Sequence, residues 1–283
     1  MTVLVLGATG KTGKPLVQAL AARGVTVRAA TRTPGPAADG VEPVRFDWAD
    51  HGSWAPALTG ADGLYLVGPA GEPEAATLLR ELLDAAPDIR RVVLLSVLGV
   101  DRLPTVIPMA TWEQDVRESG KEWTVLRPNW FQQNFGEGAF GAPLRDHGTL
   151  ELPAADAALS FIDTRDIAAV AALALTEDGH AGQVHELTGP QSLTHAEALA
   201  IIGKAAGRDL RYTPLTPDQF ADKLRSAGAP EPIATWQLAL FALIREGLNT
   251  PTTNTVERLT GTPPHPLTTY ATTHATTWHP TPS

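Results

Sequence analysis

The first thirteen residues constrain the fold of this chain more than any other segment. An apolar run at residues 3–6 is followed at once by a glycine-rich loop at 7–13 (GATGKTG) and then by a segment with helical periodicity. A buried strand, a glycine-rich turn and a helix start, in that order, form the phosphate-binding turn of dinucleotide-binding folds. N–H groups at a helix start have no partners within the helix and attract anions. We therefore expect this turn to bind a pyrophosphate.

Each of the three glycines has an expected role in the turn. Gly7 permits the tight turn, Gly10 lets the backbone approach the pyrophosphate, and Gly13 lets the helix and strand pack closely. The end of the loop also resembles a P-loop, but that motif needs a glycine where this chain has Val5. The alternative that remains is a flexible turn without a ligand.

Apolar runs alternate with helical periodicity through the first half of the chain. The expected strands are 3–6, 25–30, 44–46, 63–67, 92–95 and 124–126, and the expected helices are 13–23, 53–58, 73–86 and 110–119. Short, continuously apolar strands that alternate with helices indicate a parallel sheet covered on both faces. The sequence therefore predicts an α/β fold, a doubly wound Rossmann sheet whose ligand lies at the carboxyl ends of the strands.

After about residue 128 the pattern changes. Gly136, Gly138 and the segment 141–143 indicate irregular chain. Asp166 and Thr194 are expected N-caps of helices 167–176 and 196–206. The other expected elements are strands at 149–152, 159–162 and 184–187 and helices at 217–227, 233–246 and 255–259.

These patterns predict a division into two domains. Residues 1–155 are expected to form the dinucleotide-binding domain, with 159–187 returning to its sheet. Residues 188–283 are expected to form a smaller, mostly helical substrate-binding lobe. Its last residues, rich in Thr, Pro and His, are expected to be a loosely packed tail, because no carboxylates accompany His265, His274 and His279 to make a metal site.

The composition excludes several function classes. The net charge is -9, and the sequence contains no cluster of basic residues. Both features argue against nucleic acid and anionic membranes as partners. The chain has no cysteine, so disulfides, thiolate metal sites and a cysteine nucleophile are excluded. No long apolar segment or signal peptide is recognisable. We expect a soluble cytoplasmic protein, a monomer or homodimer, that binds a small-molecule substrate and no metal.

The end of the second expected strand predicts which dinucleotide is bound. NAD-binding folds usually carry an acidic residue there for the ribose 2′-hydroxyl, but this chain has Arg32, which would attract a 2′-phosphate. This favours NADP(H); a solvated surface arginine is the alternative. Arg28 either assists or points outward. The expected cofactor-binding residues are Gly7, Thr9, Gly10, Lys11, Thr12, Gly13, Arg32, Asp47 (for adenine), Gly68, Pro69 and Ser96.

The catalytic pair of ordinary ketone-reducing short-chain dehydrogenases is missing. Those enzymes use Tyr-x-x-x-Lys, in which the lysine lowers the pKa of the tyrosine so that it transfers a proton. None of the three tyrosines, Tyr65, Tyr212 and Tyr270, is followed by lysine four residues later. Ser96 ends the fifth expected strand and is a candidate catalytic residue, although a strand-end hydroxyl or a nicotinamide contact is favoured.

Several motifs together resemble the NmrA-like branch of the atypical short-chain dehydrogenases. They are the loop at 7–13, Arg32, and the segments 95–100, 119–128 and 161–168. Within that branch, the segments 127–135 and 187–190 and the run around Gly207 and Arg208 are most similar to agroclavine-dehydrogenase-type proteins and their bacterial relatives. The resemblance implies reduction of an iminium C=N bond with NADPH. Members with the catalytic pair would carry it near Thr105 and Met109, so its absence here puts ordinary carbonyl reduction in doubt.

The substrate is expected beside the sixth strand, at the carboxyl edge of the sheet. Aromatic side chains there would wall an apolar pocket and favour a cationic substrate, or would instead pack the joint between two lobes. Asp163 and Asp166 are interpreted as structural, and His147, His180, His185 and His195 as satisfied or exposed. The expected pocket residues are Met109, Trp112, Asn129, Trp130, Phe131 and Phe135.

Three functions fit these residues. The favoured one is an NADPH-dependent reductase of an iminium C=N or an activated C=C bond in bacterial secondary metabolism, in which the protein orients the reactants and the cofactor supplies the chemistry. The second is a non-catalytic NADP(H) sensor that regulates a partner protein. The third is a cyclase or isomerase that uses the same fold without redox chemistry.

Overall fold

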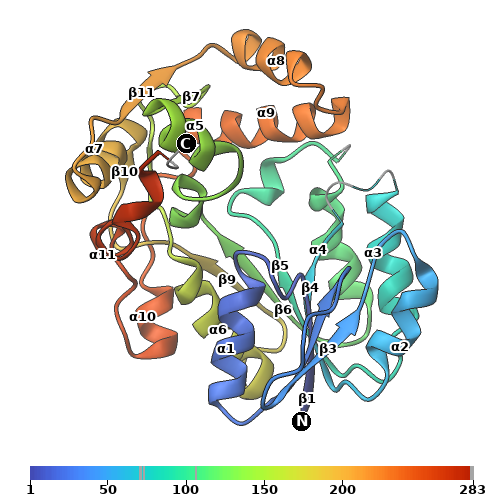
Figure 1. Cartoon of the computed structure of the whole chain (residues 1–283). Helices are drawn as coiled ribbons and strands as arrows, with labels where there is room; N and C mark the ends of the chain where they lie inside the picture. Colours follow the sequence, from blue (N-terminus) through green and yellow to red (C-terminus); the bar gives the residue numbers. More distant parts are fainter. Residues whose placement is uncertain (70–71, 73, 106, 281–283) are drawn as a thin grey trace. The chain divides into compact units, whose positions relative to one another are not determined.

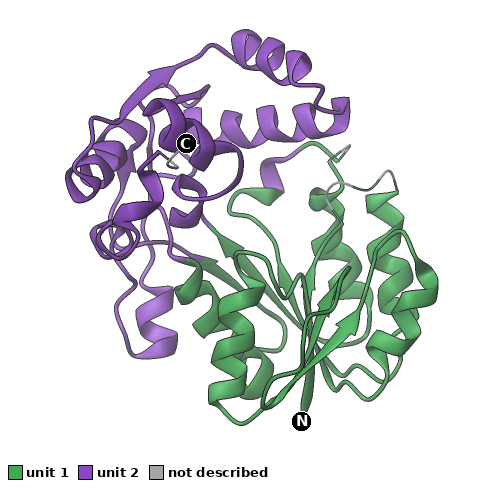
Figure 2. Cartoon of the chain, viewed as in Figure 1, with its two compact units in different colours: residues 1–100, 104–128, 164–186 green, residues 101–103, 129–163, 187–283 purple. Residues whose placement is uncertain are grey.

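A computed structural model describes residues 1–69, 72, 74–105 and 107–280 of the chain. The chain divides into two compact units (Figure 2). Unit 1 comprises Met1–Val100, Pro104–Pro128 and Thr164–Glu186, and unit 2 comprises Asp101–Leu103, Asn129–Asp163 and Leu187–Ser283. The units group residues 129–163 with the C-terminal part of the chain, whereas we expected residues 1–155 to form one domain.

Unit 1 is built around a parallel sheet of seven strands in the described part of the chain (Figure 1). Their spatial order is β3-β2-β1-β4-β5-β6-β9. The first six of these positions follow the order of a doubly wound dinucleotide-binding sheet, and the pairs from β3 to β6 are parallel. This confirms the expected Rossmann fold. The strands are β1 (Thr2–Leu6), β2 (Thr26–Thr31), β3 (Val41–Arg45), β4 (Gly63–Val67), β5 (Arg91–Leu95), β6 (Glu122–Pro128) and β9 (Gln183–Leu187).

The central strands are apolar because both faces of the sheet are covered. Val3, Leu4 and Val5 in β1 have no exposed surface, and β4 and β5 are almost as deeply buried. Helix α1 packs with α6, and α3 packs with α4. The helices of this unit are α1 (Gly13–Ala22), α2 (Trp54–Leu58), α3 (Ala75–Asp84), α4 (Met109–Glu118) and α6 (Thr164–Thr176). The expected start of α3 at residue 73 lies outside the described residues.

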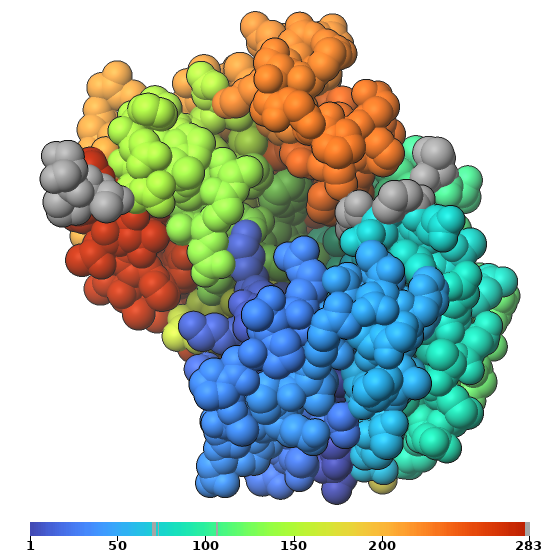
Figure 3. All heavy atoms as spheres, turned by 45° about the vertical axis from the view of Figure 1, so that its right-hand side comes forward, coloured from blue at the N-terminus to red at the C-terminus, as the bar shows by residue number. Residues whose placement is uncertain are grey.

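Unit 2 surrounds its own apolar core with helices and short strands. Strand β7 (Thr149–Leu152) pairs in parallel with β11 (Arg211–Pro214), and β8 (Ala158–Leu159) pairs antiparallel with β10 (Leu193–Thr194). Helices α8 and α9 pack on each other and form neighbouring parts of the surface, in orange in Figure 3. The helices are α5 (Gly138–His147), α7 (His195–Ala206), α8 (Pro217–Ser226), α9 (Glu231–Arg245), α10 (Thr255–Thr260) and α11 (Leu267–Thr273).

The N-cap expected at Thr194 is confirmed, and the one expected at Asp166 is wrong. The Thr194 hydroxyl accepts a hydrogen bond from the Glu197 N–H at 3.1 Å, and the Glu197 carboxylate accepts one from the Thr194 N–H at 2.8 Å. Helix α6 instead begins two residues before Asp166, which lies inside its first turn. A carboxylate in the first turn is stabilised by the positive end of the helix dipole. Aspartate is therefore typical both of the N-cap and of the first turn, and the sequence alone does not distinguish the two positions.

Helix α5 forms where the sequence predicted irregular chain. Its glycines and Pro143 suggested a break, yet the helix runs from Gly138 to His147. A Cβ atom built on Gly141 would lie 2.5 Å from the backbone of Gly136. Gly141 therefore permits a close approach of the helix to the preceding turn. A glycine needed for packing inside a helix looks the same in the sequence as a glycine in a loop.

The expectation of a loosely packed C-terminal tail is wrong. Tyr270 in α11 is buried, and Trp278, in the turn at Ala275–Trp278, has no exposed surface. The indole N–H of Trp278 donates to the carbonyl oxygen of Phe135 at 2.7 Å. These two aromatic side chains attach a segment of otherwise polar composition to the core of unit 2. No helix of the described residues is long and apolar enough to cross a membrane.

One buried histidine in unit 2 lies among aromatic rings. His195 is 1% exposed, and neither ring nitrogen has a hydrogen-bond partner in the described structure. Its ring stacks on Tyr212 at 5.2 Å and meets Phe161 edge-on at 5.4 Å. Burial lowers the pKa of His195 from 6.5 to about 4, because the charged imidazolium would lose its hydration there. His195 is therefore neutral in the folded protein near pH 7.

This histidine should make the stability of the protein fall in mild acid. Below pH 6.5 the unfolded chain binds a proton at His195 that the folded chain does not bind until about pH 4. The free energy of unfolding should therefore be intact above pH 6.5 and fall by on the order of 3 kcal/mol as the pH approaches 4. In His195→Phe, urea unfolding at a series of pH values should show a shallower decline. The exposed His147→Gln is the control, and a His195→Phe protein as acid-sensitive as wild type would contradict the assignment.

Candidate functional site

The glycine-rich turn joins β1 to α1 at the carboxyl edge of the sheet. Gly7 has a φ of 63°, a left-handed conformation that favours glycine, and its carbonyl oxygen accepts the Gly10 N–H at 2.8 Å. A Cβ atom on Gly13 would lie 2.2 Å from the same carbonyl oxygen. The start of α1 therefore approaches the turn closely enough that only glycine fits at residue 13.

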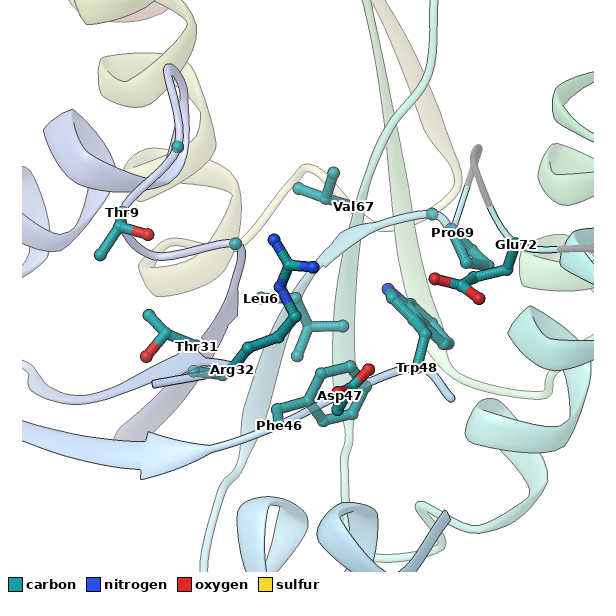
Figure 4. A pocket seen from close by; sticks show the side chains of 14 residues that line it. Leu6, Thr9, Thr31, Arg32, Phe46, Asp47, Trp48, Val67, Pro69 and Glu72 are labelled. Carbon is teal, nitrogen blue, oxygen red and sulfur yellow. The ribbon is translucent and has the colours of Figure 1, made fainter. Parts of the chain in front are cut away.

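A cavity of about 390 Å³ opens beside this turn, where β1, β2, β3 and β4 end (Figure 4). Seven of the residues that the sequence predicted for cofactor binding line it: Gly7, Thr9, Gly10, Arg32, Asp47, Gly68 and Pro69. The other lining residues were not expected from the sequence; they are Leu6, Ala30, Thr31, Phe46, Trp48, Val67 and Glu72. The parallel order of the strands explains the convergence, because their carboxyl ends meet at one edge.

Two arginines of the second strand region have different surroundings. Arg32 is exposed, and its guanidinium extends into the cavity between the glycine-rich turn and Trp48 (Figure 4). The guanidinium of Arg28 instead donates to the carbonyl oxygens of Thr59 at 2.7 Å and Pro56 at 2.8 Å. The possible assisting role of Arg28 in binding a 2′-phosphate is therefore not supported, since its donors stabilise the end of α2.

Asp47 lies at the opposite side of the cavity from the glycine-rich turn. One carboxylate oxygen accepts the Ala49 N–H at 3.1 Å, which closes a small turn after β3. The backbone of Asp47 is held as well, because its carbonyl oxygen accepts the indole N–H of Trp54 at 3.0 Å. Trp48 follows directly, and its ring lines the cavity. The only sequence signal for Trp48 is its place after a strand-end aspartate.

The remaining predicted cofactor residues do not line this cavity. Thr12 is buried at the start of α1, and Lys11 lies in the same turn.

Gly68, which lines the cavity, is confined by Trp112, because a Cβ atom on Gly68 would lie 2.4 Å from the indole ring. Trp112 is itself buried and donates its indole N–H to the carbonyl oxygen of Ala75 at 2.9 Å. The ring expected to wall a substrate pocket thus packs inside unit 1.

Ser96 belongs to a buried hydrogen-bond network rather than to an exposed edge. It is 3% exposed, and its hydroxyl donates to the carboxylate of Glu113 at 2.7 Å. Arg127 binds both oxygens of that carboxylate at 2.8 Å, and Arg117 adds a bond at 3.0 Å. From the sequence, Glu113 was expected to face solvent on its helix or to hold a positive charge nearby; the solvent-facing position is wrong, because Glu113 is buried. Four charge-assisted bonds satisfy the buried carboxylate, and they orient the Ser96 hydroxyl toward it.

The residues expected to line a substrate pocket are distributed over both units. Met109, at the start of α4, is in unit 1, and Asn129, Trp130, Phe131 and Phe135 are in unit 2. Asn129 is buried and donates to Ser160 Oγ at 2.6 Å and the Asn249 carbonyl oxygen at 2.7 Å. Its side chain therefore connects three segments of unit 2 and has no donor left for a substrate.

The aromatic residues after β6 contribute mainly to the core of unit 2. Phe135 is buried and meets Phe161 at 5.0 Å, and Trp130 packs against Phe241 at 4.9 Å. Trp130 and Phe131 keep part of their surface exposed. The structure therefore gives Phe135 a packing role, while pocket lining by Trp130 and Phe131 stays a prediction.

The close approach at the glycine-rich turn can be tested by adding one methyl group. Gly13→Ala should lower the free energy of unfolding by about 1–3 kcal/mol, because the carbonyl group of Gly7 cannot move without distorting β1. Denaturant unfolding followed by circular dichroism measures the change. Gly35→Ala is the matched control, since a Cβ atom there meets nothing within 4 Å. Equal stability of the two variants would refute the packing argument.

Comparison with known proteins identifies the family of this chain. The model of the NmrA-like family matches residues 1–258. An NAD(P)H azoreductase of Xenophilus azovorans is 32% identical, with 96% of this chain and 98% of the relative covered. Agroclavine dehydrogenase of Claviceps fusiformis is 29% identical, with coverage of 98% and 99%.

A solved structure shows the same arrangement of the chain. The quinone oxidoreductase QOR2 of Escherichia coli, crystallised with NADPH, has a TM-score of 0.81 and 26% identity, and the match covers 96% of this chain and 99% of that one. The expected resemblance is thereby confirmed, both for the family and for agroclavine dehydrogenase as a relative. The chain belongs to the NmrA-like family.

Proposed function

We propose that this protein is an NADPH-dependent reductase of a small organic molecule. At the coarser level it is an NAD(P)H-dependent oxidoreductase of the NmrA-like family, like the azoreductase and the quinone oxidoreductase that it resembles. The observation that carries the proposal is the cavity in which the glycine-rich turn and Arg32 face the same space. A cytoplasmic location and a role in bacterial secondary metabolism stay predictions.

The lining residues fit the adenosine end of NADP(H). The turn at Gly7 and Gly10 lets the backbone approach a pyrophosphate, and the positive end of the α1 dipole lies at the same turn. Arg32 supplies a guanidinium suited to a 2′-phosphate, and neither Asp nor Glu occupies that position. Asp47 has a carboxylate at the cavity for the amino group of adenine. These groups bind and orient the cofactor, which supplies hydride when bound.

The proposed substrate is a hydride acceptor that does not need a tyrosine to protonate it. The chain has no Tyr-x-x-x-Lys pair, so its residues offer no phenol with a lysine-lowered pKa. An iminium C=N bond accepts hydride at a carbon that is already electron-poor. In an activated C=C bond, the negative charge that hydride brings is delocalised onto the activating group. The names of the relatives, an azoreductase, a quinone oxidoreductase and an agroclavine dehydrogenase, support an electron-poor acceptor.

The direct test of this function is NADPH oxidation with a panel of iminium ions, quinones, azo dyes and enones. We expect loss of NADPH absorbance with at least one of them and slower reaction with simple ketones. Binding of NADPH without oxidation by any acceptor would overturn the reductase and leave a nucleotide-binding protein. Product formation without NADPH oxidation would point to a non-redox reaction.

Arg32 should determine the preference for the phosphorylated cofactor. Arg32→Ala should weaken NADPH binding about tenfold to hundredfold, equivalent to about 1.5–3 kcal/mol for a charge-assisted contact, and leave NADH binding nearly unchanged. Calorimetric titration with both nucleotides measures this. The control is Arg45→Ala, an exposed arginine at the end of β3 that pairs with Asp50 and does not line the cavity. Equal losses for both nucleotides would remove Arg32 from the phosphate site.

Ser96 should be dispensable for the chemical step. Its hydroxyl donates to Glu113, and the three bonds from the two arginines hold that carboxylate without it. Ser96→Ala should therefore keep kcat within about tenfold of wild type while the unfolding free energy falls by about 1.5–3 kcal/mol. Steady-state kinetics and urea unfolding on the same preparation separate the two effects. A fall in kcat of three orders of magnitude with unchanged stability would make Ser96 catalytic.

A further inference from the structure

The cavity has an aromatic wall that the proposed phosphate and amino-group contacts do not use. Trp48 lines the cavity directly after Asp47, and its side chain is only half-buried. Figure 4 shows its indole across the cavity from the Arg32 guanidinium. A large ring that is left partly in water at the edge of a polar site has apolar surface available for a ligand.

Neighbouring rings fix the orientation of this indole. Trp48 meets Phe46 at 5.1 Å with an interplanar angle of 87°, and Trp54 at 5.8 Å with an angle of 82°. Trp54 is buried and donates its N–H to the carbonyl oxygen of Asp47 at 3.0 Å, so the backbone just before Trp48 is held too. A ring held by two perpendicular contacts loses little freedom when a ligand stacks on it.

The charges around the cavity indicate what the ring would stack on. A guanidinium on one side suits a phosphate, and the carboxylates of Asp47 and Glu72 on the side of the indole suit an amino donor. An aromatic face, a hydrogen-bond acceptor and a cation around one cavity match a phosphorylated adenine nucleoside. The volume of about 390 Å³ lies near the lower end of the about 300–1,000 Å³ found for small-molecule sites, which suits one nucleoside rather than a whole dinucleotide.

We propose that Trp48 stacks on the adenine ring and is a determinant of cofactor affinity. The inference rests on the proposed NADP(H) function and assigns this cavity to the 2′-phosphoadenosine half of the cofactor. Trp54 is a positioning residue, because it does not line the cavity and acts on the ligand through the orientation of Trp48. Phe46 also orients Trp48, and it lines the cavity itself. Stacking of a base on an aromatic side chain is insensitive to the rest of the ligand, so it contributes equally to NADPH and to its adenosine fragment.

Adenosine 2′,5′-bisphosphate is the probe, because it carries the adenine and the 2′-phosphate without nicotinamide. In calorimetric titration, Trp48→Ala should bind it about tenfold to hundredfold more weakly than wild type. Trp48→Phe should retain affinity within a few-fold, since a phenyl ring also stacks. Trp123→Phe is the matched control, a half-buried tryptophan of unit 1 whose ring contacts the Arg117 guanidinium and does not line the cavity.

Fluorescence gives a second readout that does not depend on the folding of Trp48→Ala. A purine in contact with an indole quenches its emission, so the bisphosphate should quench the wild type and Trp123→Phe alike. In Trp48→Phe the probe should still bind by calorimetry while the greater part of this quenching is lost. Undiminished quenching in Trp48→Phe would overturn the proposal.

The outcomes separate this inference from the proposed function. Binding of the bisphosphate by wild type with unchanged affinity in Trp48→Ala overturns the stacking role and leaves the NADP(H) site intact. Failure of wild type to bind either the bisphosphate or NADPH overturns both. A loss of affinity in Trp48→Ala together with retention in Trp48→Phe and Trp123→Phe is the expected result.

Discussion

The approach of α1 to the carbonyl group of Gly7 is the contact on which the candidate site depends. A side chain at Gly13 would meet that oxygen at 2.2 Å, so the helix can begin this close to β1 only with glycine there. This close packing places the N-terminus of α1 at the carboxyl edge of the sheet, where strands β1 to β4 end together. The site therefore follows from backbone geometry first, and its side chains add selectivity.

The proposed selectivity for NADP(H) depends on the different positions of two arginines in and after β2. Arg28 lies within β2, and its guanidinium satisfies the carbonyl oxygens of Pro56 and Thr59 near the end of α2. Arg32 lies just beyond the strand, where the chain has left the sheet, and its guanidinium reaches the cavity. Arg28 therefore has a structural role, whereas Arg32 is free to take the proposed ligand-binding role, because only Arg32 follows the last hydrogen-bonded position of the strand.

Strands β1, β4 and β5 were predictable because their centres are continuous apolar runs, and β4 has the expected bounds. Strand β3 was expected at 44–46 but runs from Val41 to Arg45, because its charged residues and proline conceal its start. The errors lie where one residue type has two uses. Gly141 and Pro143 suggested a break but belong to α5, and Tyr270 and Trp278 anchor a segment whose composition suggested a tail. In the site, Arg32 and Asp47 were recognisable from their place after strands. Trp48 was not recognisable as a site residue, because the part of its ring that stays exposed depends on how Phe46 and Trp54 pack against it.

The buried carboxylate of Glu113 explains why the edge of β5 is poorly suited to proton transfer. Its two oxygens accept three bonds from the guanidinium groups of Arg117 and Arg127, and the fourth bond uses the only hydroxyl proton of Ser96. Losing that proton would place a second negative charge beside a carboxylate, which costs free energy at a site this deeply buried. Ser96 thus retains only acceptor capacity. For the proposed reductase, this state of the strand-end hydroxyl and the lack of a Tyr-x-x-x-Lys motif favour acceptors that take hydride without an enzyme-supplied proton over ketones.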